Sequence, residues 1–193
     1  MHELDLVATP SQTAGPYLHL GLTANRSVGC LAGANAKGER IWLTCRIFDG
    51  DGTPVSDAMI EIWQANADGK YHHPEDTQEK AMDPVFDGFG RLATGEGGSC
   101  VFETVKPGRV PGNDGVMQAP HLSVSIFARG LLKRLATRIY FAGDPANQED
   151  VVLSLVPQER RSTLMAQPDP SRHGGWSFDI HLQGEGETVF FDI

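Results

Sequence analysis

The sequence predicts an all-β protein built as a β-sandwich, with one short helix. At least seven segments combine β-branched or aromatic residues with period-2 alternation, and turn residues separate them. Glycine (22 residues) and proline (12 residues) are more frequent than in an average globular protein, without reaching the level typical of disorder. Only 157–166 (PQERRSTLMA) has a helical pattern, with proline in its first turn. Many short strands with frequent turns are typical of two packed sheets.

The predicted strands begin at residue 41. Segment 41–48 (IWLTCRIF) runs into the turn residues 49–52 (DGDG), and the apolar pattern resumes at 58–65 (AMIEIWQA). We expect these two strands to form a hairpin or a neighbouring pair. Segment 99–105 (SCVFETV) alternates and ends at a Lys-Pro-Gly turn. The other predicted strands are 121–128, 135–141, 176–182 and 188–193.

Long loops are expected at 66–90 and 107–119, between the predicted strands. No internal repeat and no break in composition marks a second domain, so residues 41–193 are predicted to form a single structural domain. Residues 1–40 are expected to form an extended N-terminal arm with glycine-rich loops that packs on a partner subunit. The glycine clusters at 95–98 and 184–186 are predicted to be β-turns, because neither is followed by the helix that a nucleotide-binding loop requires.

The charge and the cysteines exclude several classes of function. The chain has 16 Lys and Arg against 25 Asp and Glu, a net charge of −9, which repels phosphate backbones and anionic lipid headgroups. Cys30, Cys45 and Cys100 are odd in number and form no C-x-x-C motif, so neither a disulfide framework nor a zinc site is indicated. The first residues lack the basic and apolar regions of a signal peptide, and we expect a cytoplasmic protein.

Two polar clusters have simpler interpretations than a metal site. Segment 72–76 (HHPED) collects several ligand types, but adjacent side chains of an extended loop point in different directions, which favours a solvated loop. The acidic turn at 49–52 lacks the glycine and the glutamate that a calcium loop needs at its sixth and twelfth positions, which here are Pro54 and Ile60. We expect metal binding at neither cluster.

Six segments that together span most of the chain carry a resemblance to a known family. They are 9–22 (TPSQTAGPYLHLGL), 61–71 (EIWQANADGKY), 105–112 (VKPGRVPG), 119–130 (APHLSVSIFARG), 138–145 (RIYFAGDP) and 183–193 (QGEGETVFFDI). The chain resembles the intradiol ring-cleavage dioxygenases and, among them, the α chains of protocatechuate 3,4-dioxygenase. The resemblance implies an immunoglobulin-like β-sandwich and a role in aromatic catabolism, in which a catechol ring is opened between its two hydroxyl groups with non-haem Fe(III).

Carried over to this sequence, the family's iron-ligand positions are only half retained. The resemblance places the two tyrosine ligands of catalytic β chains at Tyr71 and Val110, and the two histidine ligands at His121 and Ser123. An arginine of catalytic chains falls at Gln118. Phenolate oxygens stabilise Fe(III) and imidazole suits iron, whereas valine offers no donor. The resemblance therefore implies a degenerate iron site, with no metal and no catalytic residue in this chain and Fe(III) bound by a partner β chain.

The resemblance also implies that the chain lines its partner's substrate pocket. The positions concerned are Thr13, Gly15, Pro16, Tyr17 and Arg129. Thr13 offers a hydroxyl group, Gly15 allows close backbone approach, and Arg129 adds positive potential for a carboxylate. The expected function is that of the α subunit in a higher hetero-oligomer of αβ units that converts protocatechuate and O₂ into 3-carboxy-cis,cis-muconate, the isolated chain being inactive.

Two alternatives stay open from the sequence. The chain could be a self-sufficient homomeric intradiol dioxygenase, in which Tyr17, His72 or His73 replaces the missing iron ligands. It could instead be a non-enzymatic β-sandwich that binds small aromatic ligands or another protein through residues 9–22. The iron content of the chain tests the first alternative, and activity gained on adding a β chain tests the second.

Overall fold

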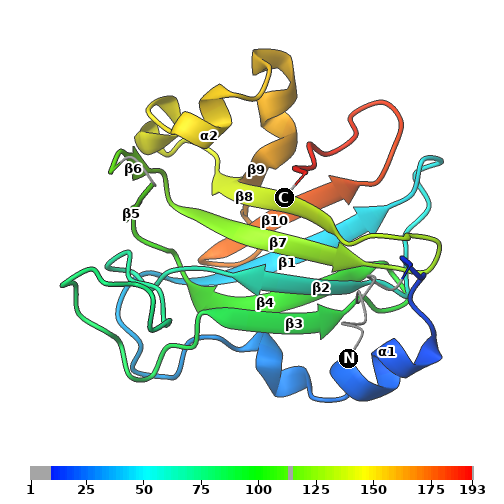
Figure 1. Ribbon diagram of the computed structural model, residues 1–193, viewed down its shortest axis with the longest axis horizontal. Helices are drawn as coiled ribbons and strands as arrows, with labels where there is room; N and C mark the ends of the chain where they lie inside the picture. Colours follow the sequence, from blue (N-terminus) through cyan, green and yellow to red (C-terminus); the bar gives the residue numbers. More distant parts are fainter. Residues whose placement is uncertain (1–9, 113–114, 193) are drawn as a thin grey trace, which may run out of the picture.

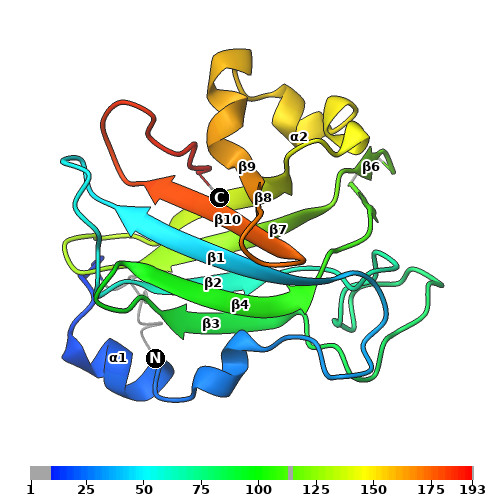
Figure 2. The same cartoon turned by 180° about the vertical axis from the view of Figure 1, so that it is seen from behind.

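The protein is a mostly β structure in two packed layers, with a few short helices at their edges (Figures 1 and 2). The computed structural model describes residues 10–112 and 115–192. Eight strands follow one another in the order β3-β2-β7-β8-β9-β10-β1-β4. Figure 1 shows β3, β2, β7 and β8 in the near layer, and Figure 2 shows β10, β1 and β4 in front when the molecule is turned around.

The bounds of the strands follow the sequence prediction closely in most places. They are β1 Arg40–Phe48, β2 Met59–Trp63, β3 Phe89–Ala93, β4 Ser99–Val105, β5 Val110–Pro111, β6 Met117–Gln118, β7 His121–Phe127, β8 Leu135–Phe141, β9 Met165–Asp169 and β10 Gly175–His181. The predicted mostly β sandwich is therefore confirmed at the level of its layers. Strands β3, β5, β6 and β9 were not predicted, and the short β5 and β6 lie within the segment 107–119 that was expected to be a loop. The predicted strand 188–193 is wrong for its described residues, where Phe191 forms only an isolated bridge to Ala136.

The predicted hairpin between the first two strands is also wrong. The turn at 49–52 exists, and Phe48 bridges Pro54 just beyond it. Strand β1, however, pairs with β10 and β4, whereas β2 pairs with β3 and β7. The chain therefore crosses from one layer to the other between these two strands. The predicted turns at 95–98 and 184–186 are confirmed by hydrogen bonds from Gly98 N to Gly95 O (2.8 Å) and from Glu187 N to Gly184 O (3.1 Å).

The prediction of a single helix was wrong. The described residues contain two α-helices, α1 Pro16–Leu22 and α2 Val151–Ser154, and the 3₁₀ helices η1 Arg26–Gly29, η2 Pro145–Gln148 and η3 Gln158–Leu164. The predicted helix at 157–166 corresponds to η3, which is 3₁₀ in character, as is common for short connecting segments. None of the helices described is long and apolar enough to cross a membrane.

The N-terminal region is less uniformly extended than predicted. Pro16 begins α1, where its fixed φ and missing N–H suit the first helical position. Farther along, Leu31 and Ala32 are buried in the main core of this chain, and Ala32 bridges Phe86. The part of residues 1–40 around these two side chains therefore packs on its own sandwich.

The core lies between the two layers. Strand β1 alternates between partly exposed and buried residues, and its inward side chains Ile41, Leu43, Cys45 and Ile47 are fully buried. Cys45 lies opposite Cys100 of β4, and both are free thiols. Burial raises the pKa of each. The apolar alternation read from the sequence thus places the core correctly.

A second, smaller apolar cluster lies beyond β8, under α2 and η3. Its buried members are Ala119, Tyr140, Leu153, Val156 and Leu164. The buried carboxylate of Asp150 holds this cluster together, because it accepts hydrogen bonds from Ala119 N (2.7 Å), Leu153 N (2.7 Å) and the Tyr140 hydroxyl (3.0 Å). Asp150 thereby begins α2, anchors the segment before β7 and fixes a side chain of β8.

We expect Asp150→Ala to destabilise the fold by about 3 kcal/mol, because three buried donors lose their acceptor at once. The free energy of unfolding in urea measures the effect. Glu149→Ala is the matched control, since this neighbouring carboxylate is mostly exposed in its pair with Arg109 and should change stability by less than about 0.5 kcal/mol. Equal effects of the two substitutions would contradict the anchoring role of Asp150.

Candidate degenerate metal site and N-terminal arm

The register of β7 gathers the candidate site on the outer face of the near layer. Ser123 lies opposite Trp63 of β2 on one side and opposite Arg138 of β8 on the other, and His121 lies opposite Tyr140. Residues directly opposite each other in antiparallel strands point to the same face, as do residues two apart in one strand. These five side chains therefore share one face, while the alternate residues of β7 point into the core.

Tyr71 reaches this face from the loop that follows β2. Its ring stacks almost parallel on Trp63, with centroids 5.9 Å apart and an interplanar angle of 8°. Its backbone N–H donates to Asp76 Oδ2 at 2.7 Å. Burial raises the pKa of the Tyr71 phenol, and nearby Arg138 partly opposes that shift. Tyr71 is thus held as a neutral phenol at neutral pH.

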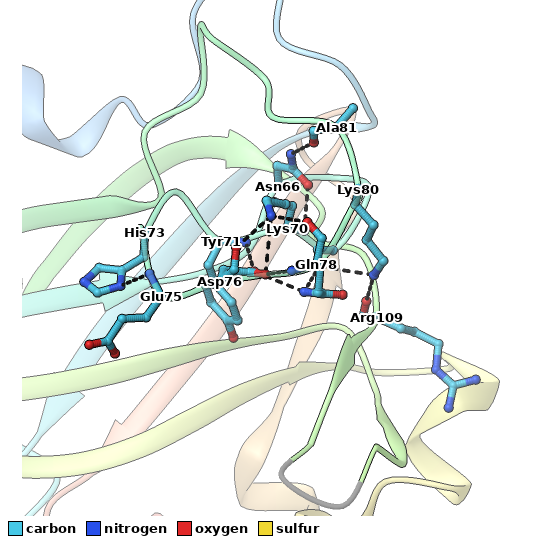
Figure 3. Close-up of polar contacts among 11 residues, drawn as sticks. Asn66, Lys70, Tyr71, His73, Glu75, Asp76, Gln78, Lys80, Ala81 and Arg109 are labelled. Carbon is cyan, nitrogen blue, oxygen red and sulfur yellow. Dashed lines mark hydrogen bonds and ion pairs between the residues drawn. The ribbon is translucent and has the colours of Figure 1, made fainter.

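A polar network fixes the loop that carries Tyr71 (Figure 3). Asn66 Oδ1 accepts from the backbone N–H of Asp68 (3.0 Å) and of Lys70 (2.9 Å). The buried Lys70 ammonium donates to the carbonyl groups of Asp76 and Gln78. Together these bonds close the loop on itself and leave little freedom for Tyr71.

The same loop is tied to the segment before Val110. Lys80 Nζ donates to Arg109 O at 3.0 Å (Figure 3). Gly69, at φ +78°, lies against Arg109 O, and a side chain there would collide with that carbonyl. The two loops thereby form the walls of a pocket of about 800 Å³, which is lined by Trp63, Tyr71, His73, Glu75, Asp76, Thr77, Gln78, Val110, Pro111 and Gly112.

Val110 and Gln118 are brought next to each other in the two-residue strands β5 and β6. Val110 is buried and lines the pocket beside Tyr71. Gln118 Oε1 accepts a hydrogen bond from Arg138 at 2.6 Å. The structure thus assembles all four ligand positions of the resemblance, Tyr71, Val110, His121 and Ser123, at one end of β7, with Gln118 beside them.

His121 is deeply buried, with 4% of its surface exposed. Its Nδ1–H donates to Ala119 O at 2.8 Å, and its ring lies 5.8 Å from that of Tyr140. Burial lowers the pKa of His121 to about 4, and the neighbouring Arg138 acts in the same direction. The ring is therefore neutral at neutral pH, with Nε2 as its remaining acceptor.

The residues at this site do not make an iron-binding set. Tyr71 and His121 can each offer one donor, Val110 offers none, and a serine hydroxyl at 123 is a weak neutral donor for Fe(III). In residues 10–112 and 115–192 no group of three or more His, Cys, Asp and Glu side chains could hold a metal ion. The HHPED segment is a solvated loop only in part. Residues 72–75 are exposed, and His73 makes an edge contact with Trp63 and accepts a hydrogen bond from Glu75 N (3.3 Å). The Asp76 side chain, in contrast, is only 7% exposed and belongs to the network around Lys70.

The N-terminal residues proposed to line a partner's pocket lie elsewhere. Thr13 Oγ1 accepts a hydrogen bond from Gly130 N at 2.7 Å, which ties the arm to the loop after β7. Arg129 in this loop forms an ion pair with Asp57 at 2.8 Å and leaves 78% of its side chain exposed. Tyr17, on α1, is 84% exposed. Gly15 and Pro16 begin the same helix.

These two groups of candidate residues are separated by the length of β7. Arg129 follows His121 by eight positions along an extended strand, a distance of roughly 25 Å. The structure therefore brings the degenerate ligand positions together at one end and the arm with Arg129 at the other. The arm of this chain and its own degenerate site do not share a pocket.

Sequence reasoning missed three residues of the site: Trp63, Arg138 and Tyr140. Arg138 was detectable, because it is a charged residue inside the apolar segment 135–141, where a buried or functional partner is required. The position of Trp63 beside Tyr71 depends on a loop of seven residues and could not be read from spacing. Tyr140 was hidden by its apolar neighbours, and its role becomes clear from its hydrogen bond to Asp150.

Comparisons with known proteins agree with one another. A family model described as "Dioxygenase" matches residues 13–184. The protocatechuate 3,4-dioxygenase alpha chain of Pseudomonas putida is 42% identical over 97% of this chain and 98% of its own length. The beta chain of the Burkholderia cepacia enzyme is 39% identical over 78% of this chain and 67% of its own length. The dioxygenase domain of a carbohydrate-binding fusion protein from Streptomyces sp. SirexAA-E superposes with a TM-score of 0.62 at 25% identity, covering 91% of this chain and 98% of that domain.

The buried His121 should make the fold less stable in mild acid. An unfolded histidine takes up a proton near pH 6.5, whereas folded His121 does so only near pH 4. Because the unfolded chain binds more protons in this window, stability falls as the pH drops from about 6.5 to about 4, by up to about 3 kcal/mol from this residue. Urea unfolding at a series of pH values measures the slope.

In His121→Gln this part of the pH dependence should disappear. His73→Gln, at an exposed position of the pocket loop, is the control and should keep the slope of the unmodified chain. An identical slope in His121→Gln would show that this imidazole is not held neutral by the fold.

Proposed function

The chain belongs to the dioxygenase family, and from that premise we propose that it acts as the α subunit of an intradiol dioxygenase whose iron is bound by a homologous β chain. The substrate we propose is protocatechuate, as in the α chains that it matches over nearly its full length. Catechol cleavage between the two hydroxyl groups adds both atoms of O₂ and yields the dicarboxylate end groups of 3-carboxy-cis,cis-muconate. We also propose that the β-sandwich is immunoglobulin-like and that residues 1–40 form an arm separate from the domain of residues 41–193.

The observation that carries the proposal is the incomplete set of iron donors at the His121 end of β7. The fold of the site is intact, since Tyr71 and His121 are held by stacking, burial and hydrogen bonds. Its donor set is incomplete, because Val110 and Ser123 stand at two of the four ligand positions. Losing an outer-shell partner alone typically costs a metal site 10–100-fold in affinity, so the loss of two direct donors removes tight Fe(III) binding.

The second support comes from Arg129 and the N-terminal arm, which lie exposed at the other end of β7. A substrate with a carboxylate needs cations or N–H donors to offset the loss of water in a pocket. Arg129 offers a largely exposed guanidinium with one carboxylate partner, Asp57, and Thr13 holds the arm beside it. Because this group cannot reach the site of its own chain, we propose that it lines the pocket of the β chain.

In the complex, iron in the β chain would act as a Lewis acid that draws electron density from the catecholate and so opens it to O₂. The residues of this chain would do the binding and positioning. Arg129 would attract the substrate carboxylate, Gly15 would allow backbone contact, and Pro16 and Tyr17 would shape the pocket and exclude water.

The iron content of the purified chain tests the proposal directly. We expect a colourless protein with iron far below one atom per chain and no ring-cleavage activity. Adding the β chain should restore activity, with one iron per αβ pair. A red-brown protein with near-stoichiometric iron would instead support the self-sufficient homomer, and activity unchanged by the β chain would contradict a role as its subunit.

The role of Arg129 is tested in the αβ complex. Arg129→Ala should raise KM for protocatechuate by about tenfold with a smaller effect on kcat, because it removes a charge that assists binding. Lys133→Ala, which removes an exposed cation from the same loop, is the control and should leave KM close to its original value. If both constants are unchanged in Arg129→Ala, this arginine does not belong to the substrate pocket.

A further inference from the structure

Asp57 lies across from Arg129, at the opposite end of the sheet face from the degenerate site. In the β2–β7 pair Met59 lies opposite Phe127, and Asp57 and Arg129 are the next residues on the same face, two positions farther along. Their ion pair of 2.8 Å shows that this register continues past the ends of both strands. The sheet itself therefore sets Asp57 beside Arg129, as a cross-strand pair of opposite charge.

The backbone around Asp57 is firmly held. Ala58, the next residue, is fully buried. Its N–H donates to Thr94 Oγ1 (3.0 Å), and its carbonyl accepts from Thr94 N (2.9 Å). On the other side, Val55 N donates to Ile47 O (2.9 Å). Asp57 thus has a rigid support, although it lies in the connection between β1 and β2.

Helix α1 is held by the same residue. It has seven residues, none of them buried, and a helix of this length is not stable on its own. The Nε2–H of His19 donates to the Asp57 carbonyl at 2.9 Å. The Thr13 hydroxyl accepts from Gly130 N, next to Arg129. The arm is therefore fastened to the sheet on both sides of the Asp57–Arg129 pair.

The Arg129 guanidinium can bind a second carboxylate while it is paired with Asp57. The ion pair joins Nη2 to Oδ2, and 78% of the arginine side chain stays exposed. A guanidinium carries five N–H donors in a rigid planar fork. An unpaired arginine side chain samples many rotamers, and binding a ligand must then select one of them, which weakens binding. A carboxylate that already holds the fork removes part of this penalty.

We propose that Asp57 is a positioning residue: its carboxylate holds the Arg129 guanidinium in the orientation that binds the substrate carboxylate in the partner's pocket, and its carbonyl group keeps α1 beside that guanidinium. This inference rests on the proposed function, in which Arg129 and the arm line that pocket, and it adds the residue that sets their geometry.

Asp57 also lowers the positive potential at Arg129, so positioning and simple neutralisation have opposite consequences. If Asp57 positions the guanidinium, its loss weakens recognition of a carboxylate substrate. If Asp57 only neutralises the guanidinium, its loss strengthens the attraction for an anion.

The test uses the αβ complex and two substrates, protocatechuate and catechol, of which catechol lacks the carboxylate. Asp57→Asn removes the charge and keeps the backbone carbonyl to which His19 donates. Asp51→Asn, at an exposed position of the same β1–β2 connection, is the matched control. KM and kcat are measured from oxygen consumption for these two variants, for Arg129→Ala and for Asp57→Asn/Arg129→Ala.

We expect Asp57→Asn to raise KM for protocatechuate by about threefold with little change in kcat, and to leave KM for catechol nearly unchanged. The double variant should match Arg129→Ala, because Asp57 acts through that arginine. Asp51→Asn should behave like the unmodified complex.

An unchanged or lower KM for protocatechuate in Asp57→Asn would overturn the proposal. An equal rise for both substrates, or additive effects in the double variant, would overturn it as well. The melting temperature and the iron content of each complex identify a variant that fails to fold or assemble, and Asp57→Ser then serves as a second uncharged replacement. An unmodified complex without ring-cleavage activity is a different result, since it overturns the proposed function itself.

Discussion

The register of β7 between β2 and β8 is the constraint on which the site depends. It sets Ser123 beside both Trp63 and Arg138, and it sets His121 beside Tyr140. A slip by one residue would move these side chains into the core and expose Leu122, Val124 and Ile126, all of which are buried. Burial of the apolar side chains of β7 therefore fixes the positions of the polar side chains on its other face. This register is required whether or not the face binds a metal, because the same strand carries the core.

The polar face is stabilised by charges that the fold itself supplies. Asp150, fully enclosed, receives three hydrogen bonds and connects α2, the segment before β7 and Tyr140. Arg138 contacts the same Tyr140 hydroxyl at 3.4 Å. The Asp150 carboxylate is satisfied by its three donors, and the Tyr140 hydroxyl connects it to the Arg138 guanidinium. The neutral His121 fits this arrangement, since protonation would place a second cation beside Arg138.

Much of the fold could be predicted because its strands alternate clearly. The pattern of 99–105 and 135–141 gave bounds identical to those of β4 and β8. In β8 residues of both faces are buried, which fits its mostly apolar sequence. Strand β3 contains a glycine and shows little alternation, and β9 contains a proline. Neither strand therefore shows the period-2 pattern by which the other strands were predicted. The two partner strands of β1, β10 and β4, could not be predicted, because strand pairing depends on contacts between residues far apart in the sequence.

The candidate site, like the fold, could be predicted only in part. The resemblance located Tyr71, Val110, His121 and Ser123, and the structure brings all four together. Arg138 was missed because the sequence shows only that it lies in a strand, whereas its role follows from which residue faces it across β7. A contact of this kind is determined by register, which period-2 alternation alone does not supply.

The two ends of β7 explain why this chain is suited to act in a pair. Its degenerate site lies at one end, and its exposed arm and Arg129 lie at the other, separated by roughly 25 Å. A single copy cannot bring the exposed guanidinium to its own pocket without rebuilding the sheet between them. A homologous chain that presents its own site to this arm needs no such change. This separation is consistent with the proposed division of labour, in which the partner chain binds the iron and this chain supplies side chains to its partner's pocket.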